Sequence, residues 1–310
     1  MSSTNGKSAA AAAQPELVEL GRAVDRVRLE KDVKAVTRLR NPGSAGWRQV
    51  QALLAKRLVG LGFVLERHDY GTGTNLVGRL GGASKEQVIA SAHYDHLTAC
   101  AGADDNASGV AAALEAARLL ASRSHTKSLV IAFWDEEERG LLGSRAFATR
   151  AREHGEAIAV ALSFDAVAFA SDGERSQGVP PGFERLLPAQ AAQLAARSFR
   201  GDFIAVVGST SARALTDRLA VYAPLFGLPL IRVDITPVEA ALMPDLFRSD
   251  HASFWLSGYP ALLLTDTAEL RNPNYHCLRG ADAPATLDYA FLTRVTGTAV
   301  AALADALQQP

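Results

Sequence analysis

An apolar run that ends in a block of acids constrains the fold of this chain more than any other feature. Residues 128–144 read SLVIAFWDEEERGLLGS, so the apolar run is followed by an aspartate, the glutamates 136–138 and a helix-like segment with small residues. Glutamate is a poor strand residue, and adjacent negative charges repel one another. We therefore expect a buried strand that ends at the glutamates, and a positive partner such as a metal beside them.

Short apolar runs alternate with helical patterns along most of the chain. We predict strands at 75–80, 87–93, 128–134, 157–164, 203–207, 230–234 and 261–265. We predict helices at 15–40, 45–61, 107–122, 141–154, 189–199, 211–220, 251–256 and 287–307. Continuous apolar strands indicate burial on both faces. The alternation therefore predicts an α/β fold, with a central, mostly parallel mixed β-sheet sandwiched between helices.

The composition predicts one globular domain and excludes several classes of partner. The chain has 310 residues, 48% of them hydrophobic, and a formal net charge of -1. It has no long basic block, so nothing favours nucleic acid or an anionic membrane as a partner. We expect a single domain at 15–310 behind a disordered tail at 1–14, and a surface loop at 171–188. The oligomeric state is not indicated.

The N-terminal segment bears on the expected location. Lys7 is followed by a run of alanines as in a signal peptide, but the apolar part is short and ends at Gln14. The longest apolar stretch, AIAVALSFDAVAFA, contains Asp165 and so is not expected to span a membrane. We therefore expect a cytoplasmic protein, unless a misplaced start codon hides an export signal. The two cysteines, Cys100 and Cys277, are too few for a disulfide scaffold.

Metal-ligand residue types follow several of the predicted strands. Open α/β sheets place their chemistry at the carboxyl ends of strands, and there we find His93, Asp95, the glutamates and Asp165. Asp104 and Asp105 precede a predicted helix, and His276 lies in a late loop. Residues i and i+2 of an extended segment point the same way, so His93 can bind a metal while Asp95 fixes its ring. Mixed nitrogen and oxygen ligands suit zinc, with cobalt or manganese as alternatives.

These motifs resemble the dizinc aminopeptidase family of bacterial secreted leucyl aminopeptidases and aminopeptidase Y. The similar segments lie in the expected order between residues 90 and 290: AHYDHL (92–97), GADDNASGVAAALEAARLL (102–120), FWDEEERGLLGS (133–144), SFDAVA (163–168), RSDHASFW (248–255) and NPNYH (272–276). The resemblance implies a zinc-exopeptidase-like fold, two zinc ions per chain and a peptide or amide substrate. It implies five metal ligands, with His93 and Asp165 on one ion, Glu138 and His276 on the other, and Asp105 bridging them.

The resemblance also assigns roles beside the ligands. Asp95 should orient His93. The family pattern Glu-Glu-x-Gly-Leu fits only the register that starts at Glu137, so Glu137 is the implied general base, which moves a proton from water to the leaving amine. Glu136 is then an extra acid, expected on the surface or at a pocket rim. A cis peptide bond is implied between Asp105 and Asn106.

The segment after the ligand histidine departs from the family. It reads HCLRGADAPATLDY, is longer than in the relatives, and has Asp282 where they carry an aspartate. Packing is favoured over metal ligation for Cys277, and a Cys100–Cys277 disulfide is an alternative because both cysteines flank ligand loops. His96 is either a core residue or a support for a ligand.

Plainer roles are expected for several other polar residues. Asp104 is expected to cap the following helix. The segment 249–251 (Ser-Asp-His) is expected at a loop–helix junction near the pocket. Three arginines are expected at the surface, although any of them is a candidate to bind a substrate carboxylate: Arg248, Arg271 and Arg279.

The sequence leaves several functions open, in a clear order. A metal-dependent exopeptidase comes first, and within that class an aminopeptidase. A carboxypeptidase, dipeptidase or other amide hydrolase on the same site comes second. A glutaminyl-cyclase-like enzyme would use one zinc ion rather than two, and an enzyme of specialised-metabolite biosynthesis is a related alternative. A non-catalytic binding module is disfavoured, because all five ligands and the base are retained.

Overall fold

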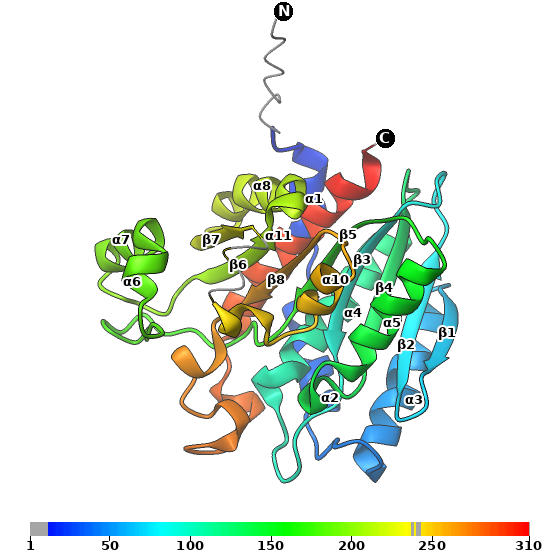
Figure 1. Ribbon diagram of the computed structural model, residues 1–310, viewed down its shortest axis with the longest axis horizontal. Helices are drawn as coiled ribbons and strands as arrows, with labels where there is room; N and C mark the ends of the chain where they lie inside the picture. The colour runs from blue at the N-terminus through cyan, green and yellow to red at the C-terminus, as the bar shows by residue number, and fades with distance from the viewer. Residues whose placement is uncertain (1–11, 237–238, 240–242, 310) are drawn as a thin grey trace, which may run out of the picture.

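An eight-stranded sheet runs through the part of the chain that the computed structural model describes, residues 12–236, 239 and 243–309 (Figure 1). The strand order is β1-β2-β4-β3-β5-β8-β6-β7. The strands are β1 (Val64–Asp69), β2 (Thr74–Leu80), β3 (Gln87–His93), β4 (Ser128–Trp134), β5 (Ile158–Phe164), β6 (Ile204–Ser209), β7 (Leu230–Ile235) and β8 (Ala261–Thr265).

The central strands are parallel and the outer ones make the sheet mixed. β3 pairs in parallel with β4 and β5, β5 with β8, and β6 with β7. Antiparallel pairs join β1 to β2, β2 to β4 and β6 to β8. The predicted mostly parallel mixed sheet is therefore confirmed. The prediction missed β1, because its sequence VLERHD lacks the apolar run of a buried strand and lies at the exposed edge.

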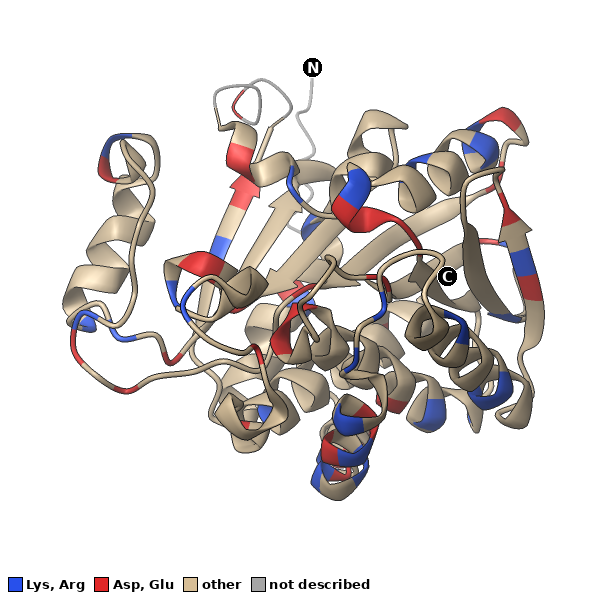
Figure 2. Cartoon of the chain, turned by 90° about the horizontal axis from the view of Figure 1, so that it is seen from below, with Lys and Arg blue, Asp and Glu red and all other residues tan. Residues whose placement is uncertain are grey.

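Helices cover both faces of the sheet. One face carries α1 (Pro15–Arg22), α2 (Arg26–Val36), α3 (Ala45–Gly60), α4 (Gly109–Ala121), α8 (Arg213–Tyr222) and α11 (Tyr289–Gln308). The other carries α5 (Leu142–Glu153), α10 (His251–Leu256) and α7 (Pro188–Ala196). The short helix α6 (Phe183–Leu186) lies with α7 beyond β7 (Figure 1). Basic and acidic residues are interspersed along the helices (Figure 2), in keeping with the net charge of -1.

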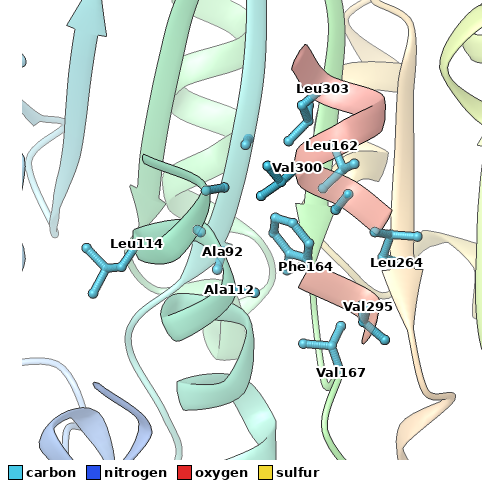
Figure 3. Packing of buried hydrophobic residues seen from close by; sticks show 14 of the residues in the cluster. Ala92, Ala112, Leu114, Leu162, Phe164, Val167, Leu264, Val295, Val300 and Leu303 are labelled. Carbon is cyan, nitrogen blue, oxygen red and sulfur yellow. The ribbon is translucent and has the colours of Figure 1, made fainter. Parts of the chain in front are cut away.

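The largest core cluster lies between α4, α11 and the central strands. Figure 3 shows Val300 and Leu303 of α11 beside Leu162 and Phe164 of β5, and all four are buried. Each such side chain stabilises the fold by roughly 1.5–3 kcal/mol through burial. By length and composition α11 could cross a membrane, but 83% of its most apolar window is buried inside the fold. α11 is therefore a core helix, and it packs against one face of the sheet.

Two expectations about the N-terminal region need revision. The predicted helix 15–40 is two helices, because the side chain of Asp25 accepts hydrogen bonds from the backbone N–H groups of Val27 and Arg28 and starts α2. Of the predicted tail 1–14, residues 1–11 lie outside the described residues. Ala13 packs against the main core, and the backbone N–H of Gln14 donates to the Tyr222 hydroxyl.

Candidate metal centre and active site

The predicted ligands come from neighbouring strand ends and two loops. His93 is the last residue of β3, Asp165 follows β5, and Glu138 lies in the short 3-10 turn Glu137–Arg139 after β4. Because β3, β4 and β5 are adjacent and parallel, their carboxyl ends meet at one edge of the sheet. Asp105 lies in the turn Ala103–Ser108 before α4, where its own backbone is not helical, and His276 lies in the turn Tyr275–Cys277 after β8.

Asp105 lies between the two histidines. Its Oδ1 is 3.1 Å from His93 Nε2, and its Oδ2 is 3.0 Å from His276 Nε2. Each histidine also has a second carboxylate: Asp165 Oδ1 lies 3.5 Å from His93 Nε2, and Glu138 Oε2 lies 3.3 Å from His276 Nε2. The structure thus brings together all five residues and in the pairing that the resemblance implies. The Asp105–Asn106 peptide bond is cis, as expected.

The electrostatics of this cluster fit cations. Burial alone would lower the pKa of each histidine, but neighbouring carboxylates outweigh it and raise the pKa of His276 to about 10 and that of His93 well above its usual range. Burial alone would raise the pKa of Asp105, yet its contacts with His276 and His93 hold it well below its usual range. The cluster therefore attracts positive charge.

The donor atoms also fit a metal. His276 Nε2 and Glu138 Oε1 are buried and have close N–O contacts, but neither has a hydrogen bond of good geometry within the described chain. Two groups have ligand atoms within 4.8 Å of one another: His93, Asp105 and Asp165, and His96, Asp105 and Glu138. The second group holds His96 where the resemblance implies His276, although His276 Nε2 also lies 3.0 Å from Asp105 and 3.3 Å from Glu138. Such imidazole and carboxylate sets suit zinc. The residues present therefore fit two divalent cations that share Asp105.

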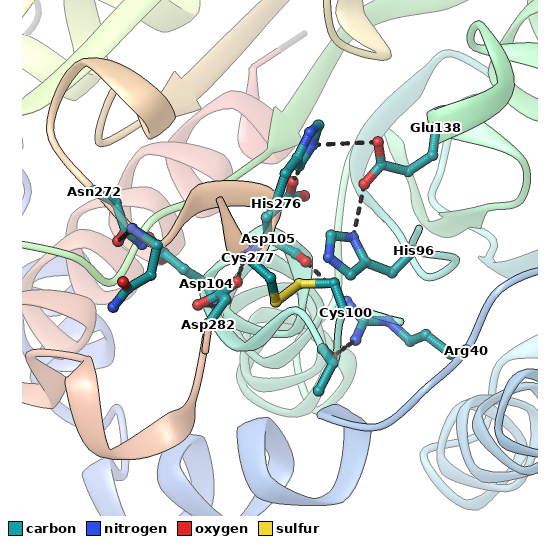
Figure 4. Close-up of a disulfide and its surroundings, with 12 residues drawn as sticks. Arg40, His96, Cys100, Asp104, Asp105, Glu138, Asn272, His276, Cys277 and Asp282 are labelled. Carbon is teal, nitrogen blue, oxygen red and sulfur yellow. Dashed lines mark hydrogen bonds and ion pairs between the residues drawn. A yellow bond between two sulfur atoms is a disulfide. The ribbon is translucent and has the colours of Figure 1, made fainter. Parts of the chain in front are cut away.

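His96 supports a ligand rather than only filling the core. Its Nδ1 lies 2.7 Å from Glu138 Oε1, so Glu138 has one carboxylate oxygen toward His96 and the other toward His276 (Figure 4). The His96 side chain is fully buried. Of the two roles that the sequence left open, the geometry favours the supporting one. The residue type in AHYDHL was visible in the sequence, but the direction of its ring was not.

Asp95 contacts more than the ring it was expected to orient. Its Oδ1 lies 3.5 Å from His93 Nδ1, outside good hydrogen-bond geometry. The same oxygen accepts a 3.0 Å hydrogen bond from the backbone N–H of Glu137, and Oδ2 accepts a 3.4 Å bond from that of Glu138. Asp95 therefore also fixes the acidic turn. Backbone acceptors of this kind leave no signal in a sequence.

Glu137 lies beside the cluster without belonging to either ligand group. Its Oε2 is 4.0 Å from His93 Nε2, and the residue is 8% exposed. Burial raises the pKa of Glu137 well above its usual range; His93 opposes this shift and the Asp165 carboxylate adds to it. A carboxylate with a raised pKa next to ligand atoms has the properties of a general base.

Asp104 and Glu136 differ from expectation. Asp104 does not cap the helix: its carboxylate accepts from the backbone N–H of Ala168 and the side-chain amide of Asn272, both at 3.0 Å. Glu136 is buried, not at the surface. Its carboxylate accepts from the Tyr70 and Thr72 hydroxyls and from Arg139. The reason is the turn between β1 and β2, which brings Tyr70 and Thr72 onto Glu136; the sequence prediction missed β1 and so this hairpin.

Of the three arginines expected at the surface, Arg248 and Arg279 are exposed and Arg271 is not. Arg271 is 6% exposed and donates to Gln177 Oε1 at 2.9 Å and to the Phe203 carbonyl at 2.8 Å, so its expected surface position was wrong. Arg248 is half-exposed and forms an ion pair with Glu269.

Two further side chains, Asp282 and Arg40, hold the loop that carries Asp105. Asp282 accepts from the backbone N–H groups of Asp104 and Asp105 at 3.0 and 3.1 Å. Arg40, which the sequence did not single out, is fully buried and donates to the carbonyls of Ala101 and Asp105 (Figure 4). Long-range contacts of this kind lack a local sequence signature.

Cys100 and Cys277 form a disulfide (Figure 4), so the favoured prediction that Cys277 only packs was wrong. In its turn Cys277 follows His276, and both have left-handed φ angles of 58° and 54°. The expectation of an extended segment was therefore incorrect, and the sulfur faces the loop that carries Asp105.

A pocket of about 310 Å³ adjoins the cluster. Asp165 and Tyr275 line it, together with Phe203, which precedes β6, and apolar residues of three strands: Ala205, Val207, Ile231, Val233 and Leu263. Ser249 also lines the pocket, and α10 begins at His251, so the expected loop–helix junction near the pocket is confirmed. The predicted surface loop 171–188 contributes Val179 and Phe183 to the wall.

A sequence profile of peptidase family M28 matches residues 75–303. The chain belongs to peptidase family M28. Among curated M28-like relatives, YfbL of Escherichia coli is 31% identical over 214 residues, which are 65% of this chain and 62% of that protein. A probable lipoprotein aminopeptidase, LpqL of Mycobacterium tuberculosis, is 40% identical over 103 residues, 31% of this chain and 21% of its own length. This M28 chain thus spans less than two thirds of the length of these relatives.

Solved structures show the same fold. The LapA aminopeptidase of Legionella pneumophila superposes with a TM-score of 0.74 at 16% identity, over 100% of this chain and 77% of LapA. An aminopeptidase from Aneurinibacillus sp. strain AM-1 superposes with a TM-score of 0.69 at 13% identity, over 95% of this chain and 97% of that protein. A glutaminyl cyclase from Porphyromonas gingivalis superposes with a TM-score of 0.64 at 18% identity, over 91% of this chain and 99% of that protein. The expected zinc-exopeptidase-like fold is therefore confirmed for this M28 protein.

Proposed function

We propose that this M28 protein is a zinc-dependent exopeptidase with two ions per chain, and that it is an aminopeptidase. One observation carries the proposal. Asp105 faces a histidine with each of its two oxygens, each histidine has its own second carboxylate, and Glu137 lies beside them outside the ligand groups. That arrangement supplies both a shared ligand and a separate base.

The chain's own residues account for the proton transfers. When bound, two divalent cations would polarise the scissile carbonyl and lower the pKa of a water molecule. Glu137, with its pKa raised by burial, accepts the proton of the attacking water and delivers it to the leaving amine. Asp95 holds the backbone of Glu137 through a 3.0 Å hydrogen bond and so fixes where this carboxylate lies.

The pocket supports a substrate with a large apolar residue before the scissile bond. Its apolar wall comes from β6, β7 and β8, and Asp165 joins it to the metal centre. A free substrate α-amine placed there would meet the carboxylates of Glu137 and Asp165. Several relatives and fold neighbours carry the name aminopeptidase, which agrees with this direction.

A carboxypeptidase would need an arginine free to bind the terminal carboxylate. Arg248 lines the pocket but is paired with Glu269. Arg271 is buried and donates to Gln177 and backbone carbonyls. Arg279, the third candidate, is exposed and is not among the residues that line this pocket. The positions of the three arginines therefore favour an amino-terminal over a carboxyl-terminal exopeptidase.

The test combines metal analysis with a substrate panel. We expect two zinc ions per chain, loss of activity on chelation and its return on adding Zn²⁺. Leucyl and phenylalanyl anilides should be cleaved, and their N-acetylated forms should not. Cyclisation of N-terminal glutamine by protein with one ion would instead identify a glutaminyl-cyclase-like enzyme, and release of carboxyl-terminal residues would identify a carboxypeptidase.

We also propose that the enzyme works in an oxidising compartment, in place of the cytoplasm expected from the sequence. The support is the Cys100–Cys277 disulfide, because such bonds persist mainly outside reducing compartments. Thiol counting on denatured, unreduced protein from the native host tests this. Two free thiols per chain would restore the cytoplasmic expectation.

A further inference from the structure

The loop that carries His276 has few ties to the rest of the fold. Among the described residues, the hydrogen bonds of residues 273–281 stay within the segment 272–278. Pro273 and residues 278–281 are exposed, and the next residue, Asp282, is buried. The loop's backbone alone therefore does not fix the imidazole of His276.

Both ends of this loop are anchored, but only outside the ligand turn. At one end Asn272 donates to Asp104 at 3.0 Å, and at the other Asp282 accepts from the backbone of Asp104 and Asp105. Between these anchors the side chains provide the long-range contacts. They are the disulfide of Cys277, the approach of His276 to Asp105 and Glu138, and the position of Tyr275 in the pocket wall.

Cys100, the partner of Cys277, is buried beside a hydrogen-bonded residue. Cys100 is 2% exposed, and the next residue, Ala101, accepts a hydrogen bond from the buried guanidinium of Arg40. The same guanidinium donates to the Asp105 carbonyl at 3.1 Å. Figure 4 shows Arg40 on one side of the disulfide and His276 on the other. The bond therefore links the turn of His276 to the segment that carries Asp105.

We propose that the Cys100–Cys277 disulfide is a positioning element of the second metal site, acting through His276. This inference rests on the proposed function. Cys277 is the residue next to His276, so the bond restricts the imidazole to the neighbourhood of Asp105 and Glu138 before any ion binds. Without it the ligand turn must be ordered at the moment of binding, which costs conformational entropy and lowers affinity.

The proposal predicts different responses of the two sites. His93 ends β3 and Asp165 follows β5, and the disulfide joins neither of these segments to the His276 loop. Reduction of the disulfide should therefore weaken the second ion, bound by Glu138 and His276, by ~10–100-fold, the range typical of residues that orient a metal ligand. The first ion should keep its affinity.

The experiment titrates Zn²⁺ into metal-free protein by calorimetry, before and after treatment with tris(2-carboxyethyl)phosphine. In that reaction the phosphine takes oxygen from water to become its oxide, and the two sulfurs gain two electrons and two protons to become thiols. Circular dichroism checks that the reduced protein stays folded. We expect two strong sites in oxidised protein, one strong and one weak site in reduced protein, and two strong sites after reoxidation.

Two variants show whether the effect passes through His276. The double variant Cys100→Ser/Cys277→Ser should match reduced protein and should not respond to the phosphine, which controls for the reagent. His276→Ala keeps the disulfide but lacks the ligand, so it should hold one strong ion in either redox state. A further loss on reduction of His276→Ala would overturn the proposed route.

The remaining outcomes separate this inference from the function on which it rests. Two strong sites in both redox states, or equal weakening of both, would overturn the positioning role and leave the two-ion enzyme intact. Fewer than two sites in oxidised wild-type protein would overturn the two-ion proposal itself, and this inference with it.

Discussion

The two halves of the metal centre are built in different ways. His93 ends a central strand and is 1% exposed, and Asp165 follows the neighbouring strand. His276 lies in a turn with positive φ, and its side chain is 24% exposed. The first half is thus fixed by the sheet, whereas the second depends on Cys277, His96 and the anchors around its loop. One aspartate, Asp105, thus joins a half that the sheet positions to a half that a loop positions.

The strongest test of this comparison is Asp105→Ala, which removes the residue shared by both halves. We expect both zinc ions to be lost and hydrolysis to fall to the background rate, because each histidine loses its closest carboxylate. Metal analysis after dialysis measures this. His93→Ala and His276→Ala serve as comparisons, since each should lose mainly its own ion. Retention of either ion at wild-type affinity in Asp105→Ala would show that the halves are independent.

The next largest effect is expected from Glu137→Gln, which removes the proposed base but no ligand. Turnover should fall by ~10²–10⁴-fold, the usual contribution of a positioned acid–base group, while two ions remain bound. Steady-state kinetics together with metal content measure this. Glu136→Gln is the matched control, because Glu136 bonds to Tyr70, Thr72 and Arg139 instead of facing the ligands, and its loss should be much smaller.

How far the sequence predicted this site depended on the kind of contact. His93, Glu138 and Asp165 were recognisable because each follows an apolar run, and parallel strands bring such positions together. Asp105 and His276 needed the family motif, since loops have no periodicity. Arg40 and the backbone contacts of Asp282 could not be predicted, because they depend on which distant segments the fold brings together. Glu136 was placed wrongly because its cover, β1, lacks an apolar pattern.

His96→Ala tests the half of the site that holds Glu138 and His276. It removes the imidazole 2.7 Å from Glu138 Oε1 but no predicted ligand. We expect the affinity of the second ion to fall ~10–100-fold, as for other residues that orient a ligand, with the first ion unchanged. Calorimetric titration with Zn²⁺ resolves the two sites. Weakening of the first site instead would place His96 in the wrong half.

The smallest effect concerns Asp250, which is buried near the rigid half. Burial raises its pKa to about 7, against ~3.9 for an unperturbed aspartate. The folded state therefore binds a proton on the Asp250 carboxyl more tightly than the unfolded state does. The contribution of this protonation to the free energy of unfolding is complete below about pH 4 and is lost as the pH rises through about 7. In metal-free protein, Asp250→Asn should gain several degrees of Tm over wild type between about pH 5 and about pH 8. Calorimetry that shows a constant difference across this range would contradict the assignment.

Arg40 has a consequence for how much of the chain the proposed metal site needs. It lies before residue 75, where the match to the M28 profile starts, as does Trp47, whose indole donates to Asp135 at 2.8 Å. A chain trimmed to the shared region would lose the guanidinium that donates to the Asp105 carbonyl and leave buried acceptors without donors. The N-terminal helices are therefore part of the unit that holds the proposed metal site, and substitutions in them can change the position of its bridging aspartate.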